Sequence, residues 1–514
     1  MPRKILFAFL FLSTGLQAGD LPDVAELSVA DLQRGYEEGD FTIVDVTRAY
    51  LTRIEAYDRN GPRLNSVLTV SDDALETAEA LDRELAAGEH RGPLHGIPVL
   101  LKDNIDTHDM PTTAGSVFLA ESVPPKDAFI VKRLREAGAI ILGKTNLSEW
   151  ANFHSSFSSS GWSRLGGQVR NPYDPDRNPC GSSSGSGVAA AAGLAAVTIG
   201  TETNGSIVCP ANANGVVGMK PTVGLWSRSG IIPISHTTDS AGPMTRTVAD
   251  AAALLGPLAR IDPGDLFTAA AGAHVRDDYT QYLDADGLKG RRIGLWTEPL
   301  GSHYRVDAMT HQAVAALEEA GAEVIEIEQI SSRNINAESL TVLLHEFRFG
   351  LDQYFASLGE DAALADFDDL VARVREEPAE IARFDRSLIF RAAETEGLES
   401  EEYREALSTM LEFSREQGID RVMDEHELDA IVAPTGSPAW MTDLTLGDNF
   451  SVSSSSPSAR AGYPIISVPM GLIDGLPLGI SFFGRAWSEP DLLAMAYAYE
   501  QATGHRSSPE LSAD

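Results

Sequence analysis

Two neighbouring stretches of small residues constrain the fold of this chain more than any other feature. Residues 181–187 read Gly-Ser-Ser-Ser-Gly-Ser-Gly, and residues 188–197 contain only alanine, valine, leucine and glycine. Such small side chains allow a helix to pack closely on all sides, so we expect residues 188–197 to form a buried helix. The first stretch is then a loop that leads into the N-terminus of this helix, where backbone N–H groups and the positive dipole end are found.

A second loop of small residues follows the next apolar run. Residues 200–210 read Gly-Thr-Glu-Thr-Asn-Gly-Ser-Ile-Val-Cys-Pro. Asn204 and Gly205 tolerate unusual backbone angles, so they can turn successive N–H groups toward one point beside the Ser206 hydroxyl. Donors placed in this way stabilise the charge that develops when a nucleophile attacks a carbonyl. Each loop alone is also compatible with a purely structural turn.

A serine nucleophile needs a base, and Lys102 is the candidate. It follows an apolar run, residues 97–101, that predicts a buried strand. A free lysine has a pKa near ~10.4, so burial or a proton relay is required for it to act as a base at neutral pH. Ser182 can relay the proton between Lys102 and Ser206. The alternative is an ordinary surface ion pair between Lys102 and Asp103.

The sequence contains no recognisable metal or cofactor site, and we expect none. It has no His-Glu-x-x-His, Cys-x-x-Cys, nucleotide P-loop or dinucleotide fingerprint. His345 and His426 each precede a glutamate but have no partner one helical turn away. Three further histidines lie near the motifs without a partner at fixed spacing, and we expect structural roles for them: His95, His154 and His236.

Predicted strands and helices alternate along most of the chain, which favours one large α/β domain around a mixed or parallel sheet. Apolar runs predict strands at 97–101, 139–142, 292–296, 322–327, 429–433 and 464–469. Amphipathic patterns predict helices at 24–58, with caps at Ser28 and Thr42, and at 71–87, 128–137 and 307–320. Residues 340–425 read as a helical excursion, either a cap over the site or a layer without substrate contact. Residues 155–167 read as a structured loop despite their linker-like composition.

The net charge of −35 argues against a nucleic-acid partner, which would require basic patches. Residues 1–18 combine a basic start, a short apolar run and a small-residue end, the layout of a secretory signal peptide. We therefore expect a periplasmic or secreted protein with no stable membrane insertion after cleavage. Export permits a disulfide between the two cysteines, Cys180 and Cys209, but a buried free pair is equally compatible with the sequence.

These motifs resemble those of the amidase signature family. Lys102 lies in Gly-x-Pro-x-x-x-Lys-Asp, Ser182 in the Gly/Ser-rich loop and Ser206 in Gly-Ser-Ile. The resemblance extends from about residue 24 to 505, and the sequences around both serines look most like the bacterial peptide amidase branch. It implies a single large α/β/α domain around a mixed β-sheet.

The resemblance also implies roles for individual residues. Ser206 would be the nucleophile, Ser182 a bridging serine after a cis peptide bond, and Lys102 the base. The backbone N–H groups of four residues would form the oxyanion hole: Thr203, Asn204, Gly205 and Ser206. Two positions depart from common family members, since Asn204 replaces a glycine and Val208 an arginine. We expect these two positions to influence substrate choice.

The expected activity is hydrolysis of a carboxamide to an acid and ammonia through an acyl-enzyme. The expected substrates are C-terminal amides of peptides or other small primary amides. One alternative is a protein like the A component of the tRNA-dependent amidotransferases, which acts on charged tRNA; the signal peptide and the acidic charge oppose it. Another is a catalytically inactive ligand-binding protein, which the intact Lys/Ser/Ser set opposes.

Overall fold

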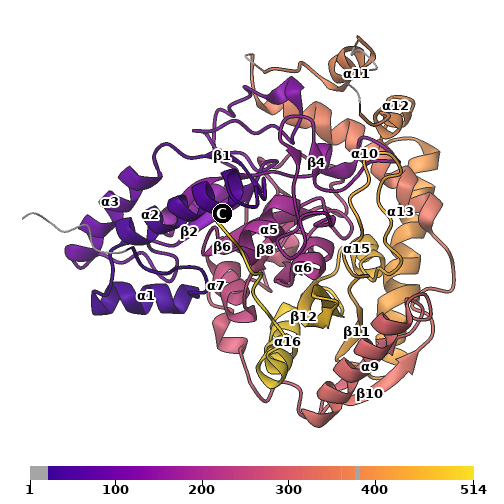
Figure 1. The fold of residues 1–514 in the computed structure, drawn as a ribbon. Helices are drawn as coiled ribbons and strands as arrows, with labels where there is room; N and C mark the ends of the chain where they lie inside the picture. The colour runs from indigo at the N-terminus through magenta and orange to yellow at the C-terminus, as the bar shows by residue number, and fades with distance from the viewer. Residues whose placement is uncertain (1–20, 361, 377–382, 514) are drawn as a thin grey trace, which may run out of the picture.

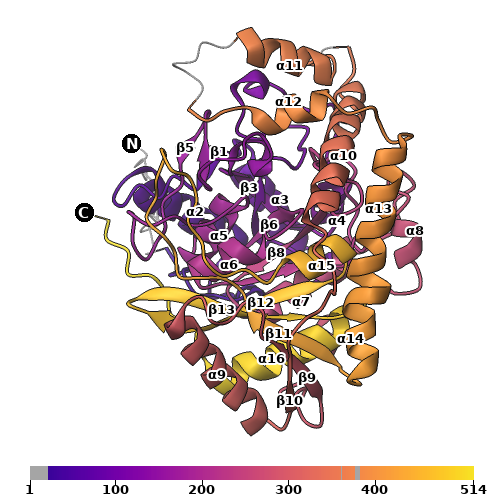
Figure 2. The same ribbon diagram turned by 90° about the vertical axis from the view of Figure 1, so that its right-hand side faces the viewer.

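A computed structural model describes residues 21–360, 362–376 and 383–513, so the expected signal peptide lies outside the described residues. An 11-stranded sheet crosses the molecule (Figures 1 and 2) in the order β1-β3-β2-β6-β8-β7-β12-β13-β11-β9-β10. Its strands are β1 (Val67–Val70), β2 (Pro98–Lys102), β3 (Ile140–Thr145), β6 (Val197–Glu202), β7 (Val217–Lys220), β8 (Ser240–Thr245), β9 (Arg292–Trp296), β10 (Glu323–Ile327), β11 (Ala430–Pro434), β12 (Ile465–Ile473) and β13 (Leu476–Phe483). A small hairpin pairs β4 (Trp162–Ser163) with β5 (Gly167–Gln168).

The sheet is mixed, which confirms the expected fold class. β3, β2 and β6 run parallel near one end, where the edge strand β1 pairs antiparallel with β3, and β11, β9 and β10 run parallel at the other end. The strands between them pair antiparallel. Every predicted strand is present within two residues of its expected start. The hairpin β4–β5 and the burial of Trp162 likewise confirm that residues 155–167 form a structured loop.

Helices cover both faces of the sheet: α5 and α6 lie on one face, and α7, α9 and α16 on the other (Figure 2). The α-helices are α1 (Val29–Glu38), α2 (Ile43–Arg53), α3 (Ala74–Ala86), α4 (Phe129–Glu136), α5 (Ser184–Ala191), α6 (Val208–Asn214), α7 (Val248–Leu258), α8 (Thr268–Ala271), α9 (Tyr304–Glu319), α10 (Asn336–Ser357), α11 (Phe367–Glu376), α12 (Ser387–Ala393), α13 (Glu401–Ser414), α14 (Asp420–Glu425), α15 (Ser456–Ala461) and α16 (Glu489–Thr503). Ser28 and Thr42 cap α1 and α2 with complete capping boxes, as predicted. In the described part of the chain, none of the helices is both long and apolar enough to cross a bilayer.

The helix after the Gly/Ser loop is shorter and lies earlier than predicted. α5 begins inside the loop, at Ser184, and ends at Ala191, whereas the expected range was 188–197. Gly193 adopts a φ of +62°, in the left-handed region that helices do not continue through, and β6 begins at Val197. The small residues at 188–197 therefore form the second half of a buried helix, a tight turn and the first residue of a buried strand.

Helices α10 to α13 lie together beside the sheet (Figures 1 and 2), in the region where the sequence predicts a helical excursion. α10 packs against α11 and α12 around an apolar cluster that includes Phe347, Phe355 and Phe367, and against α13 through a second cluster that includes Val342 and Met410. Residues of the chain near Trp150 belong to the first cluster, so this layer is anchored to the segment that follows β3.

Candidate active site

Lys102 is the last residue of β2, a strand that is buried along its whole length. Its Nζ lies 2.7 Å from Ser182 Oγ, 2.9 Å from Thr201 Oγ1 and 3.1 Å from the Thr201 carbonyl. β6, which carries Thr201, pairs parallel with β2, so both strands deliver these residues to one edge of the sheet. The structure thus brings the expected base into direct contact with the expected relay serine.

Asp103 does not pair with Lys102, which rules out the alternative of a surface ion pair between them. Lys102 is fully buried, and the Asp103 carboxylate lies 3.3 Å from Lys144 Nζ, itself buried in β3. The side chain of Asp103 also accepts from Thr113. Lys144 therefore balances the charge of Asp103, and Lys102 remains available to Ser182.

Burial lowers the pKa of Lys102 to about 7, because a charged ammonium is poorly solvated inside the protein. The nearby carboxylates of Asp239 and Glu202 act in the opposite direction and favour the charged form, but burial is the larger effect. A large fraction of Lys102 is consequently neutral at physiological pH, the state in which its nitrogen can accept a proton.

The two serine loops meet through their backbones. The Gly181–Ser182 peptide bond is cis, as the family resemblance implies. The N–H of Ser183 donates to the carbonyl of Ser206 over 3.1 Å, and the Ser182 carbonyl accepts from the N–H of Ser148 over 3.1 Å. Ser182 is almost fully buried, whereas 9% of Ser206 remains exposed. The nucleophile candidate is therefore next to the relay and reachable from solvent.

The backbone around Ser206 presents free donors. Within the described chain, the N–H groups of residues 203–206 donate to no protein acceptor. Gly205 adopts a φ of +82°, which glycine reaches without steric cost. Glu202 fixes the other side of the loop, because its carboxylate accepts from the N–H groups of Ile207 (2.7 Å) and Val208 (3.0 Å). Unpaired N–H donors in a fixed loop are what an oxyanion hole requires.

The two departures from the family pattern have structural explanations. The Asn204 side chain accepts from Ser455 Oγ (2.7 Å) and donates to Ser456 Oγ (3.2 Å), so it ties the loop to the N-terminus of α15. Val208 is buried in an apolar cluster with residues of β11 and β12. The Asn204 and Val208 side chains are therefore both held by contacts within the protein.

Thr201, Asn104 and Asp239 are site residues that the sequence analysis missed. Asn104 Nδ2 donates to Thr201 Oγ1 over 3.0 Å, the same hydroxyl that Lys102 contacts. Thr203 Oγ1 donates to Asp239 Oδ1 over 2.6 Å, and Asp239 also accepts from backbone N–H groups of residues 234 and 235. These residues follow no recognisable motif, and only the folded chain places them beside Lys102 and the nucleophile loop.

A cavity of about 590 Å³ lies next to the site, on the side where Thr201 contacts Lys102. Asn104, Thr201 and Thr203 line it from the sheet, and Phe349 and Tyr354 of α10 line it from the helical layer. Ser182 and Ser206 are not among its lining residues. Helix α10 therefore borders a cavity that lies next to the site.

A disulfide joins Cys180 and Cys209, with 5.9 Å between their Cα atoms. This answers a question that the sequence leaves open. Cys180 precedes Ser182 in its loop, and Cys209 lies in the first turn of α6, just after Ser206.

The histidines near the motifs have structural partners. His154 is buried and lies 2.6 Å from a guanidinium nitrogen of Arg386. His236 faces the carboxylate of Glu346, and His95 Nε2 lies 3.2 Å from the carbonyl of Leu81. None of these contacts in the described chain involves a serine of the site.

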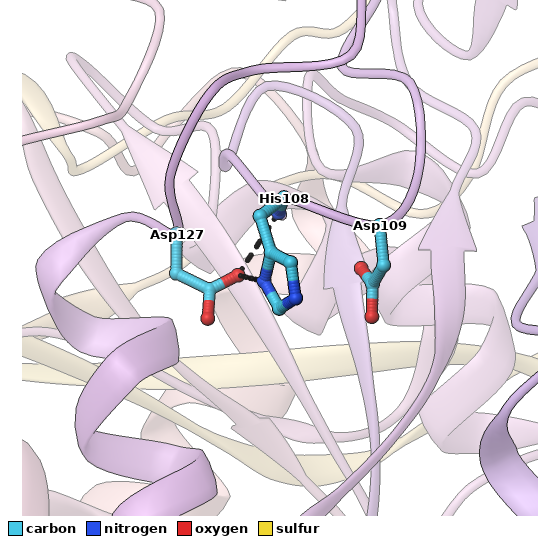
Figure 3. A group of neighbouring side chains, drawn as sticks. All are labelled: His108, Asp109 and Asp127. Carbon is cyan, nitrogen blue, oxygen red and sulfur yellow. Dashed lines mark hydrogen bonds and ion pairs between the residues drawn. The ribbon is translucent and has the colours of Figure 1, made fainter.

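Among the described residues, one group of side chains has the spacing of metal ligands (Figure 3): His108, Asp109 and Asp127. His108 Nδ1 lies 2.9 Å from Asp127, and the Arg135 guanidinium pairs with both carboxylates, at 2.6 Å from Asp109 and 3.0 Å from Asp127. Because Arg135 already neutralises the two acids, we assign no metal to this group.

Comparison with known proteins gives matches along nearly the whole chain. A family model described as Amidase matches residues 45–493. The solved structure of native peptide amidase from Stenotrophomonas maltophilia has 49% identity and a TM-score of 0.91, covering 95% of this chain and 99% of that one. A probable amidase of Arabidopsis thaliana is 40% identical over 95% of this chain and 92% of its own length. The A component of the glutamyl-tRNA(Gln) amidotransferase of Thermosynechococcus vestitus is 34% identical over 94% of this chain and 99% of its own.

Proposed function

The chain belongs to the amidase family and is an amide hydrolase, and from this premise we propose that it releases ammonia from primary carboxamides with Ser206 as nucleophile, Ser182 as relay and Lys102 as base. One observation carries the assignment: a fully buried Lys102, with its pKa lowered to about 7, lies 2.7 Å from Ser182 Oγ. A lysine in this state can accept a proton that an ordinary surface lysine cannot.

In the first half-reaction Ser206 Oγ attacks the carbonyl carbon of the amide. Its proton passes to Ser182 as the Ser182 proton passes to neutral Lys102. The N–H groups of residues 203–206 stabilise the negative oxygen of the tetrahedral intermediate. When the carbon–nitrogen bond breaks, the proton returns through Ser182 to the leaving nitrogen, which departs as ammonia and leaves an ester on Ser206.

In the second half-reaction water attacks this ester. Ser182 and Lys102 take a proton from the water, and the intermediate then expels Ser206, which recovers its proton through the same relay. The product is a carboxylic acid, and the three residues return to their starting states.

We propose C-terminal amides of peptides, or other small primary amides, as substrates. The similarity to a peptide amidase at 49% identity supports this choice. The test is ammonia release from a panel of peptide amides, fatty amides and aryl amides. Turnover of peptide amides, abolished by Ser206→Ala in a folded variant, is expected. Full activity of Ser206→Ala would refute the nucleophile assignment, and turnover of the other amides alone would refute the substrate class.

Two rival functions are distinguished by direct assays. The first is transfer of ammonia to charged tRNA, which the similarity to a component of a glutamyl-tRNA(Gln) amidotransferase raises as an alternative. That function would appear as ammonia-dependent transfer in the presence of partner proteins. An inactive binding protein would fail to react with a fluorophosphonate probe. We expect labelling of Ser206 and no transfer, and the acidic charge of −35 also disfavours binding to tRNA.

We further propose that the enzyme acts in the periplasm or outside the cell. The sequence of residues 1–18 and a disulfide, which persists in oxidising compartments, support this location. N-terminal sequencing of the exported protein is expected to show cleavage after Ala18. Recovery of the uncleaved protein in the cytoplasm alone would contradict the proposal.

A further inference from the structure

We propose that the Cys180–Cys209 disulfide positions the relay against the nucleophile, so that amide hydrolysis depends on the oxidised state of this bond. This inference rests on the proposed roles of Ser182 and Ser206. Cys180 lies two residues before Ser182, and Cys209 lies three residues after Ser206. The bond is therefore a covalent link between the two loops that carry these serines.

On the relay side, Cys180 occupies a backbone conformation that needs support. Its φ is +57°, in the left-handed region that residues other than glycine rarely adopt, and such conformations persist where the surroundings hold them. The Cys180 N–H donates to Asn178 Oδ1 (2.8 Å), and its carbonyl accepts from Ser184 Oγ (2.6 Å). These two hydrogen bonds and the disulfide together hold the backbone that enters Ser182.

On the nucleophile side, Cys209 is attached to the loop it follows. Its N–H donates to the carbonyl of Gly205 over 2.8 Å, one residue before Ser206. The other links between the two segments in the described chain are hydrogen bonds. They run from Ser183 N–H to the Ser206 carbonyl (3.1 Å), between Ser183 Oγ and the carbonyl (2.9 Å) and N–H (3.1 Å) of Thr201, and from Asn214 Nδ2 to the Pro179 carbonyl (2.9 Å). Reduction would leave the loops in contact but free to shift relative to each other.

The bond is open to chemical reduction. Cys209 is half-buried, and the two cysteines pack among Ala213, Ala439, Trp440 and Leu476. A dithiol such as dithiothreitol transfers two electrons and two protons to the bond, which yields two cysteine thiols and the cyclic disulfide of the reagent. Oxidised glutathione reverses this reaction by thiol–disulfide exchange. The chain has no third cysteine, so a thiol reagent has a single target.

The expected effect is on the chemical step. Displacement of a catalytic group by about 1 Å can lower a rate by roughly 100-fold. We expect reduction to lower kcat for a peptide amide by at least about tenfold, with KM changed by less than about twofold, and to slow fluorophosphonate labelling of Ser206 in parallel. Reoxidation is expected to restore both rates.

The experiment compares oxidised and reduced enzyme at a temperature where circular dichroism shows both to be folded. The double variant Cys180→Ala/Cys209→Ala is the matched control. It is expected to have the kcat of the reduced enzyme and no response to dithiothreitol.

Three outcomes would overturn the inference. One is a reduced enzyme with two titratable thiols and unchanged kcat. A second is loss of folding on reduction at every temperature, since the bond would then stabilise the fold as a whole. A third is a double variant with full activity. Failure of the proposed function is recognised separately, because Ser206→Ala would then keep its activity in the oxidised state.

Discussion

Lys102 combines full burial with a direct contact to Ser182, and these two properties determine how the site responds to pH. In the proposed mechanism only the neutral amine can accept the proton, and the pKa of Lys102 is lowered to about 7. Below that value the charged form dominates, so activity is lost as the pH falls and gained as it rises.

We therefore expect kcat/KM to increase about tenfold per unit below pH ~7 and to reach a plateau above it. Steady-state ammonia release from about pH 5.5 to about pH 8.5 measures this profile. Lys102→Ala is expected to lower the rate and to abolish the rise. A flat profile in the unmodified enzyme would show that a group other than Lys102 is the base.

Asn204 is expected to act through the position of its own loop. Asn204→Ala removes the contacts to Ser455 and Ser456, and we expect kcat to fall by up to about tenfold with little change in KM, because the N–H donors of the loop become less well aligned. Ser456→Ala is the control, since it leaves the shorter contact to Ser455 intact. A large change in substrate preference without loss of kcat would instead indicate direct contact of Asn204 with the acyl group.

The residues recognised from sequence are those with local signals. Lys102, Ser182 and Ser206 lie in motifs whose composition suggests chemistry, and the structure brings them together. Thr201 and Asp239 are single polar residues in apolar or loop sequence, and their neighbours come from distant parts of the chain. The pairing of Asp103 with Lys144 is equally invisible in the sequence, where Lys102 is the adjacent cation.

At the level of elements, the predicted strands and helices are those with strong periodicity or long apolar runs. Five strands of the large sheet were not predicted: β1, β6, β7, β8 and β13. β8 and β13 each contain a proline, Pro243 and Pro477, and a glycine, residues that are depleted in central strands. Tertiary contacts override that preference here, since both strands lie inside the sheet. The helix expected at 188–197 was misplaced because small apolar residues suit helix, turn and strand alike.

A buried carboxyl group connects the helical layer to Ser235 and Thr237, just before Asp239 in the chain. Glu346 of α10 accepts from Ser235, from the N–H and hydroxyl of Thr237 (3.0 and 2.5 Å) and from Tyr403 of α13 (2.7 Å). We expect Tyr403→Phe to lower the free energy of unfolding by about 1–2 kcal/mol, because it removes one partner of a buried group. Urea denaturation measures this change. Tyr403→Phe keeps the ring that stacks on His345, so an unchanged stability would mean that the hydroxyl contact contributes nothing.

For the whole molecule, the single α/β domain and its mixed sheet were predictable from the distribution of strands along the chain. The antiparallel centre was not, because pairing partners leave no trace in the composition of a strand. The net charge of −35 is a property of the whole molecule and not of any one helix or strand. A strongly negative surface attracts cationic ligands at low ionic strength and loses this effect as salt screens it.

We expect kcat/KM for an arginine-containing peptide amide to fall by several-fold between about 10 mM and about 300 mM salt. The same peptide with glutamine in place of arginine is the control and is expected to respond weakly. Stopped assays of ammonia release at each salt concentration provide the comparison. Equal responses of the two peptides would show that the surface charge does not guide substrates to the site.

The register of β2 against β6 sets a limit on how this enzyme can change. The ladder pairs Leu101 with Ile199. Lys102, the last residue of β2, therefore lies beside the end of β6 that carries Thr201 and leads to Ser206. A slip of the pairing by one residue would point the lysine to the opposite face of the sheet. Directed evolution of this scaffold should therefore leave the pairing of these two strands untouched, together with the Ser182 loop that lies between them in the chain.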